Sequence, residues 1–201
     1  MNADEAKDDG LKRKRLTVIC SCIALFGALF WLWDGVKSQE RIAARNRTAE
    51  FHKAIMSGLE NYHAEYGEYP SPVKGNVRVL LDGHDYEPSG ALMLYQALTG
   101  DGGNHIATIN GNHLPSDGRV TGEELKRVLI KDMPNEVWRK TGAGWLLVDG
   151  YGHPFQYTKG GDGSVNSTYD LWSFGESPPV GKISREVKQA TAGEGKWIAN
   201  W

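Results

Sequence analysis

The chain of 201 residues has very little cysteine, and this shortage excludes small domains held together by disulfides or by cysteine-bound zinc. Its two cysteines, Cys20 and Cys22, lie inside one apolar run, and no cysteine follows them. Side chains two positions apart on a helix point in different directions, so these thiols cannot form a disulfide with each other. Zinc-type spacing is absent as well. The sequence therefore excludes a disulfide-bonded head and a cysteine-bound zinc.

Basic surface is also scarce. The net charge is −2, and residues 12–15 (KRKR) form the one evident basic cluster. A protein that binds nucleic acid needs a basic face, so we predict no nucleic-acid partner. Beside an apolar run, the same cluster is the positive-inside signal of a membrane segment.

Recognisable catalytic motifs are also lacking. The sequence has no nucleophile elbow, metalloprotease motif or dinucleotide motif. Asp170 near Trp172, and His153 before Pro154, are better explained as strand and turn structure than as catalytic groups. The run 160–163 (GGDG) precedes neither Lys-Ser/Thr nor a helix, which indicates a hairpin tip instead of a phosphate loop. We predict no enzyme, and no catalytic, cofactor-binding or metal-binding residue.

What the sequence does contain is a long apolar run, residues 16–33. As a helix it would measure about 27 Å, near the lower limit for crossing a bilayer. Trp31 and Trp33 at its end favour a membrane interface. A cleaved signal peptide is the alternative, but the run is long for one and no A-x-A site follows. We predict a transmembrane helix in 16–33 in contact with membrane lipid, a cytoplasmic basic leader in 1–15, and the remainder outside.

Residues 34–70 predict an amphipathic extension of that helix. Asp34 and Gly35 weaken helix formation and predict a bend. Gly67 suits the position after the last helical residue, and Pro70 closes the segment. Apolar residues follow at helical spacing and predict one stripe that faces a core: Phe51, Ile55, Leu59, Tyr62 and Tyr66. The charged residues lie off this stripe: Arg45, Arg47, Glu50, Lys53 and Glu60.

Residues 71–144 predict a variable insertion with short helices. One helix is expected over 91–98, with Ser89 as its N-cap and Gly100 at its end. A capping box over 121–124 (TGEE) predicts a second helix over 125–130. Turn residues crowd between these segments.

Two features of this insertion raise the question of metal binding. Residues 117–124 match the second half of a calcium-binding EF-hand loop, but Pro115 would stand at the third ligand position and has no side-chain oxygen. A turn before a capped helix fits better. The three histidines of the region lack the spacing of a helical metal site, so we predict surface residues: His84, His105 and His113.

The C-terminal region, residues 145–201, predicts an antiparallel sheet. A strand is expected over 145–148, and strands over 155–158 and 169–174 form a hairpin. In the last strand, Tyr169 and Leu171 face one side, and Asp170 and Trp172 the other. A weak helical stripe follows at Ile183, Val187 and Ala190. Two tryptophans in 197–201 (WIANW) predict a tail docked on the domain.

Four segments together resemble the type IV pilin-like family, and in particular the major (G-type) pseudopilins of type II secretion. Residues 61–70 (NYHAEYGEYP) resemble the end of the family's long helix. Residues 148–157 (VDGYGHPFQY) look like its D-x-W-G-x-P-Y-x-Y segment, and 169–175 (YDLWSFG) like its Y-D-L-x-S-x-G strand. Residues 198–201 (IANW) match its I-x-N-W ending.

The resemblance implies an α+β fold in which a long N-terminal helix, half transmembrane and half amphipathic, packs on a small antiparallel head. It implies a filament subunit in the bacterial inner membrane, with its head in the periplasm, that takes part in protein secretion. Its partners would be other copies or other pseudopilins. The alternative is a membrane-tethered binding or scaffold module on the same fold that does not polymerise.

The chain departs from the family pattern at two places. Arg15 stands where family members have the glycine before the leader cleavage point, and Cys20 replaces their glutamate. The family's calcium-binding aspartates are also replaced, by residues 176–178 (ESP) and by Trp197. Since calcium requires several oxygen ligands, we predict no calcium at this place.

Overall fold

The computed structural model describes residues 3–130, 134–161, 163–178, 183–192 and 195–201. Within these ranges, the side chains of 3–24, 28, 135 and 192 are outside the description. The chain forms two compact units, Met1–Ile42 and Ala43–Trp201. Because the side chains of 3–24 and 28 are not described, much of the predicted transmembrane segment, residues 16–33, is described by its backbone alone. In the part that is described, we find no helix with the length and apolar character needed to span a bilayer.

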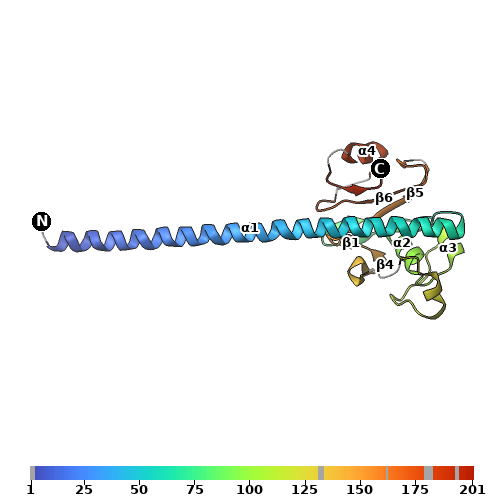
Figure 1. Cartoon of the computed structure of the whole chain (residues 1–201), viewed down its shortest axis with the longest axis horizontal. Coiled ribbons are helices and arrows are strands. Elements are labelled where there is room, and N and C mark those ends of the chain that lie inside the picture. The colour runs from blue at the N-terminus through green and yellow to red at the C-terminus, as the bar shows by residue number, and fades with distance from the viewer. Residues whose placement is uncertain (1–2, 131–133, 162, 179–182, 193–194) are drawn as a thin grey trace. The chain divides into compact units, whose positions relative to one another are not determined.

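The fold is α+β, with one long helix and small antiparallel sheets (Figure 1). Helix α1 spans Ala3–Tyr66, and its helical conformation continues through Asp34 and Gly35, where the sequence predicts a bend. The other helices are α2 (Ser89–Thr99), α3 (His105–Ile109), α4 (Arg185–Ala192) and the 3-10 helices η1 (Gly122–Arg127) and η2 (Asn135–Val137). The strands are β1 (Val79–Leu81), β2 (His84–Tyr86), β3 (Trp138–Thr141), β4 (Gly144–Leu147), β5 (Gln156–Lys159), β6 (Tyr169–Ser173) and β7 (Ile198–Ala199).

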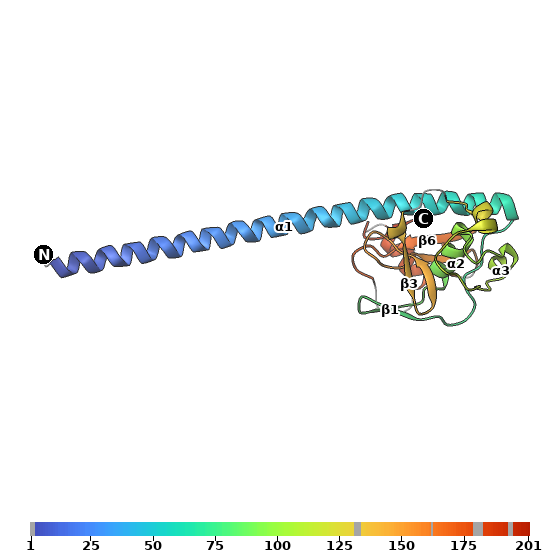
Figure 2. The same cartoon turned by 90° about the horizontal axis from the view of Figure 1, so that it is seen from below.

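The second unit is built around the last turns of α1 (Figure 2). The predicted stripe is confirmed at its centre, where Ile55, Leu59 and Tyr62 are fully buried. The stripe continues towards the N-terminus through Thr48 and His52, two buried polar residues. The helix ends as predicted. Gly67 adopts a left-handed conformation, with φ 77°, and its N–H donates to the His63 carbonyl at 2.8 Å.

From β3 to β7, each strand runs antiparallel to the next strand along the chain. The predicted hairpin is confirmed, because β5 pairs with β6. Strand β4 pairs with β3 and meets the start of β5 through a single bridge between Val148 and Pro154. Proline has no N–H to donate, which accounts for the interruption at that point. Strand β7 pairs with β6 at the other side, so the predicted docking of the tail is confirmed.

Strand β6 separates two apolar clusters. Tyr169 and Leu171 belong to the cluster that contains Ile55 and Leu59 of α1. Trp172 belongs to the other cluster, together with residues of β1 and β2. The predicted alternation of faces is therefore confirmed. All five residues of β6 are buried, because both faces are covered.

The insertion differs from its prediction in three respects. Besides short helices it contains strands β1, β2 and β3, which were not expected. Helix α2 ends at Gly100 as predicted, in a left-handed conformation, but its N-cap position is taken by Pro88 and not by Ser89. No side chain caps this end of α2. The capping box of Thr121 and Glu124 is present, but it begins the 3-10 helix η1, which ends at Arg127, so the helix predicted over 125–130 is wrong in its bounds.

The predicted apolar stripe near the C-terminus is wrong. Val187 is 41% exposed and Ala190 is also exposed. The residue of α4 that is buried is Lys188, at 3% exposure. The ion pair of Lys188 with Asp170 of β6 therefore decides which side of α4 faces the sheet.

Candidate functional site

The segment 149–153 folds into a tight turn around one carboxylate. Asp149 Oδ1 accepts hydrogen bonds from the N–H groups of Tyr151 and His153, at 2.8 and 2.9 Å. Its Oδ2 accepts from the Ser173 hydroxyl at 2.5 Å. Burial raises the pKa of the Asp149 carboxyl, while these donors act in the opposite direction. The carboxylate therefore joins this turn to the end of β6.

His153 completes the junction from the other side of the turn. Its ring is buried, and Nδ1 lies 2.8 Å from the carbonyl oxygen of Gly175. Ser173 Oγ also accepts from the Gly175 N–H at 2.9 Å. The side chains of the two family-like segments, 148–157 and 169–175, thus bind each other. Their contacts are those of a structural junction, in agreement with the interpretation of His153 as a turn residue.

The same turn packs on α1 without any intervening side chain. A Cβ placed on Gly150 would lie 2.2 Å from the Ala44 carbonyl oxygen, so only glycine fits there. The Gly150 N–H donates to Thr48 Oγ1 at 2.9 Å, and that hydroxyl donates to the Ala44 carbonyl. The residue type at 150 is set by this close approach to the helix.

The C-terminal I-x-N-W segment is anchored through Asn200. Its side-chain oxygen accepts from the Leu171 N–H at 2.9 Å, and its amide nitrogen donates to the Tyr169 carbonyl at 3.1 Å. Its own N–H donates to the Leu171 carbonyl. Asn200 therefore continues the pairing of β7 with β6 by one residue, which explains the place of asparagine in this ending.

Residues 117–124 are held as a turn and a capped helix. The N–H groups of Asp117 and Gly118 donate to the buried carboxylate of Asp101, at 3.2 and 2.8 Å. Glu124 accepts from the N–H groups of Gly102 and Thr121, both at 3.0 Å. These carboxylates bind backbone N–H groups, joining residues 101–102 to the segment 117–124, which forms the expected turn before a capped helix.

The three histidines of the insertion do not come together. His84 and His105 are exposed, as predicted. His113 is half-buried, which corrects the prediction of a surface position, and burial lowers the pKa of its ring. Among the side chains that the structure describes, no group of three or more histidine, cysteine, aspartate and glutamate residues could hold a metal ion.

Trp197 stands at one of the two places where the family that the chain resembles binds calcium. The ring of Trp197 packs edge-on against Phe174, with centroids 5.1 Å apart. Residues 176–178 follow β6 after the Gly175 turn. Asp162 of the predicted hairpin tip lies outside the described residues.

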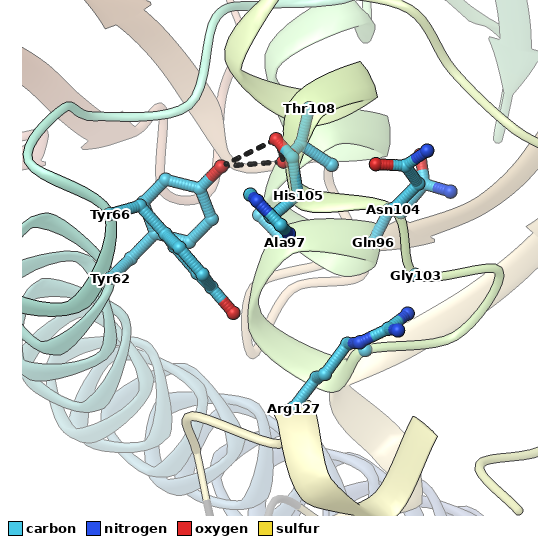
Figure 3. A pocket seen from close by; sticks show the side chains of 10 residues that line it. Tyr62, Tyr66, Gln96, Ala97, Gly103, Asn104, His105, Thr108 and Arg127 are labelled. Atoms are coloured by element: carbon cyan, nitrogen blue, oxygen red, sulfur yellow. Dashed lines mark hydrogen bonds between the residues drawn. The ribbon is translucent and has the colours of Figure 1, made fainter. Parts of the chain in front are cut away.

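A small hollow lies between α1, α2 and α3 (Figure 3). On one side the Tyr62 hydroxyl bonds to Thr108 Oγ1 at 2.5 Å, and burial raises the pKa of Tyr62 to about 12. The ring of Tyr66 stacks on His105 with centroids 4.8 Å apart, and Arg127 of η1 lines the opposite side. The space inside is about 10 Å³. It has room for roughly one water molecule, too little for a substrate.

A second hollow, of about 320 Å³, lies beside residues 149–152. Arg47 and Phe51 of α1 and Glu136 of η2 line it. Its volume is at the low end for ligand pockets. Its buried acid, Asp149, already accepts hydrogen bonds from its own turn. The Asp149 carboxylate is therefore engaged in holding the turn 149–153.

Among the side chains that the structure describes, most of the large apolar ones that are exposed lie on α1 in the first unit. Large apolar side chains are between 57% and 82% exposed there: Leu25, Phe26, Leu29, Phe30, Trp31, Leu32, Trp33 and Val36. At 3.6 residues per turn, seven of the eight lie on one broad side of the helix and Trp31 lies on the other, and all of them are exposed, whereas a helix that covers a soluble core buries its apolar stripe. Contiguous apolar surface of this kind marks contact with protein or membrane. We take this surface, residues 25–36, as the candidate functional site.

Comparison of the chain with protein-family models, with curated proteins and with solved structures finds no match.

Proposed function

We propose that the chain is a membrane-anchored, pseudopilin-like structural subunit of a type II secretion or type IV pilus-like filament. In this proposal residues 16–33 cross the bacterial inner membrane, residues 1–15 lie in the cytoplasm, and the second unit is a periplasmic head. Membrane lipid and other filament subunits are its partners. Its contribution to protein secretion is structural and involves no catalysis.

The exposed surface of residues 25–36 is the observation that carries this proposal. Trp31, at 82% exposure, is the most exposed of its large apolar side chains. At roughly 25 cal/mol per Å², such a surface gains free energy wherever lipid or neighbouring helices remove it from water. Trp33 and the nearby Lys37, whose Nζ lies 5.4 Å from the ring centroid, suit the polar boundary of a bilayer.

The junction in the head supports the same proposal. Asp149, Ser173 and Asn200 belong to the three C-terminal segments that resemble pseudopilins, and each makes a hydrogen bond between segments of the head. Residues that the resemblance singles out are thus the ones that join the turn 149–153, strand β6 and the C-terminus. A pilin-like head accounts for all three.

Cross-linking in cells tests assembly. In a background with Cys20 and Cys22 changed to serine, Leu29→Cys should give ladders of cross-linked copies or pairs with other pseudopilins. Lys53→Cys, an exposed position in the second unit, is the matched control for random collision. A monomer at Leu29→Cys under conditions that cross-link a known filament subunit would refute assembly.

A monomer that still fractionates with membranes would support the second candidate, a tethered module that does not polymerise. Arg15 and Cys20, which replace the family's glycine and glutamate, favour that candidate. Mass spectrometry of the mature protein addresses the leader directly. A start at Leu16 indicates cleavage after Arg15, whereas an intact N-terminus indicates a permanent anchor. Recovery of the protein in the soluble fraction would refute both candidates.

A further inference from the structure

One lysine of α4 is buried although its neighbours face solvent. Lys188 is 3% exposed, whereas Val187 and Gln189 on either side are exposed. An ammonium group removed from water costs several kcal/mol unless its surroundings compensate the charge. The contacts of Lys188 should therefore include such compensation.

Asp170 supplies the opposite charge. Lys188 Nζ lies 2.9 Å from Asp170 Oδ2, and this carboxylate is fully buried. A second, weaker acceptor is the Thr158 hydroxyl at 3.5 Å. Asp170 also accepts from the backbone N–H groups of Val165 and Asn166, at 2.8 and 2.9 Å. These backbone donors orient the carboxylate independently of the lysine.

Two indole rings complete the surroundings of the ammonium group. Lys188 Nζ lies 4.3 Å from the ring centroid of Trp172 and 5.8 Å from that of Trp201. The two rings contact each other edge to face, with centroids 5.6 Å apart. The face of an aromatic ring attracts a cation, most strongly when the cation is shielded from water. Charge, hydrogen bonding and ring attraction thus converge on one nitrogen atom.

We propose that Asp170, Trp172 and Trp201 form a cage for a primary ammonium group, and that Lys188 of the same chain occupies it. The walls come from β6 and the C-terminus, and α4 contributes only the occupant. Trp201 also donates from Nε1 to the Lys188 carbonyl at 3.0 Å, so the cage contacts both the ammonium group and the backbone of Lys188. Occupation of the cage keeps α4 on the sheet.

The geometry specifies the class of ligand. A primary alkylammonium ion offers N–H groups to Asp170 and a charge to both rings. A tetramethylammonium ion offers the charge without N–H donors, and 1-propanol lacks the charge. Asn200 anchors the backbone beside Trp201 through its bonds to β6, so the backbone of this wall is held independently of α4, whereas the Trp201 indole N–H is bonded to α4.

Chemical rescue of an emptied cage tests the proposal. In the full chain, Lys188→Ala should speed hydrogen exchange at the Trp201 indole N–H and in α4 on the order of a hundredfold, since a buried charge has lost its partner. Added n-propylammonium should slow exchange at Trp201 again, with saturation. Tetramethylammonium, 1-propanol and sodium at equal concentration should have no such effect.

Lys188→Met is the matched control, because it fills the cage with a neutral chain of similar length. It should lose protection like the alanine variant and gain none from n-propylammonium. Equal rescue of both variants, or a folded alanine variant without saturable rescue, would overturn the cage.

A measurement on the unmodified chain covers the case in which neither variant folds. The Lys188 ammonium protons should exchange slowly enough to be observed by ¹⁵N NMR, and their signal should disappear in Asp170→Asn. The proposal fails if no lysine ammonium of the unmodified chain is protected.

Discussion

Two stretches of α1 share a helical backbone and differ in their exposure to solvent. In residues 25–36 the large apolar side chains are exposed, for example Phe30 at 72%. In residues 44–62 the buried side recurs at helical spacing, and Ile55 and Leu59 are at 0%. The buried stretch even includes polar Thr48 and His52. Helical spacing thus predicts which residues of the second stretch are buried in the head. Apolar character alone does not predict burial, because the apolar side chains of the first stretch are exposed.

A pair of leucine substitutions should separate the two stretches with the largest effect. Leu59→Ala removes a fully buried side chain and should lower the free energy of unfolding of the head by about 2–5 kcal/mol. Leu29→Ala, in the exposed stretch, should change it by less than about 0.5 kcal/mol. Denaturant unfolding of the full chain, followed through the head tryptophans, measures both. Equal losses would erase the distinction between the stretches.

Thr48→Val should come next in size and examines a polar member of the buried stretch. The variant keeps the shape of the side chain but leaves the Gly150 N–H without its 2.9 Å acceptor. We expect a loss of about 1–3 kcal/mol, the cost of an unpaired buried donor. Thr48→Ser, which retains the hydroxyl, should recover most of the loss. If valine were tolerated as well as serine, the hydrogen bond would not hold the turn 149–153 on α1.

Local patterns predicted much of this architecture. The spacing of Ile55, Leu59 and Tyr62 identified the core face of α1, and alternation identified β6. Strands β1 and β2 carried a usable signal that the prediction missed. Asp82-Gly83 joins them, with φ values of 49° and 83°, and this dipeptide favours a two-residue hairpin turn.

Other features depend on partners far away in the sequence. The hydrogen bond of Thr48 reaches Gly150, 102 residues on, and that of His52 reaches Leu171, 119 residues on. A polar residue within an apolar stripe gives no local sign of such a partner. Lys188 shows the same limit, because apolar spacing favoured Val187 while the ion pair with Asp170 buries the lysine. The apolar run 16–33, which overlaps the candidate surface at residues 25–33, was evident from composition alone.

His52 should make the buried stretch sensitive to acid. Burial lowers the pKa of its ring below the usual 6.5, although the hydrogen bond to the Leu171 carbonyl acts in the opposite direction. The unfolded chain therefore binds a proton more readily than the native head, and stability should fall as pH drops below about 6.5. His52→Gln should flatten this part of the profile of unfolding free energy against pH.

His113→Gln gives a comparison for this prediction. Burial also lowers the pKa of His113, which lies outside α1, so its variant should remove a separate share of the pH dependence. The His52 prediction fails if His52→Gln keeps the full loss of stability between pH 7 and pH 5.

Glu60 on the exposed side of α1 should give the smallest effect. Its carboxylate accepts hydrogen bonds from the hydroxyl groups of Tyr69 and Tyr169, at 3.0 and 3.1 Å. Because Glu60 is exposed, Glu60→Gln should cost less than about 1 kcal/mol. Burial first, and then Glu60, raise the pKa of both tyrosines, so the variant should move their pKa values towards 10.0 in an ultraviolet titration. Glu50→Gln, also exposed on α1, is the control and should move neither tyrosine. An unchanged titration in Glu60→Gln would mean that the exposed side of the helix does not contribute to this contact.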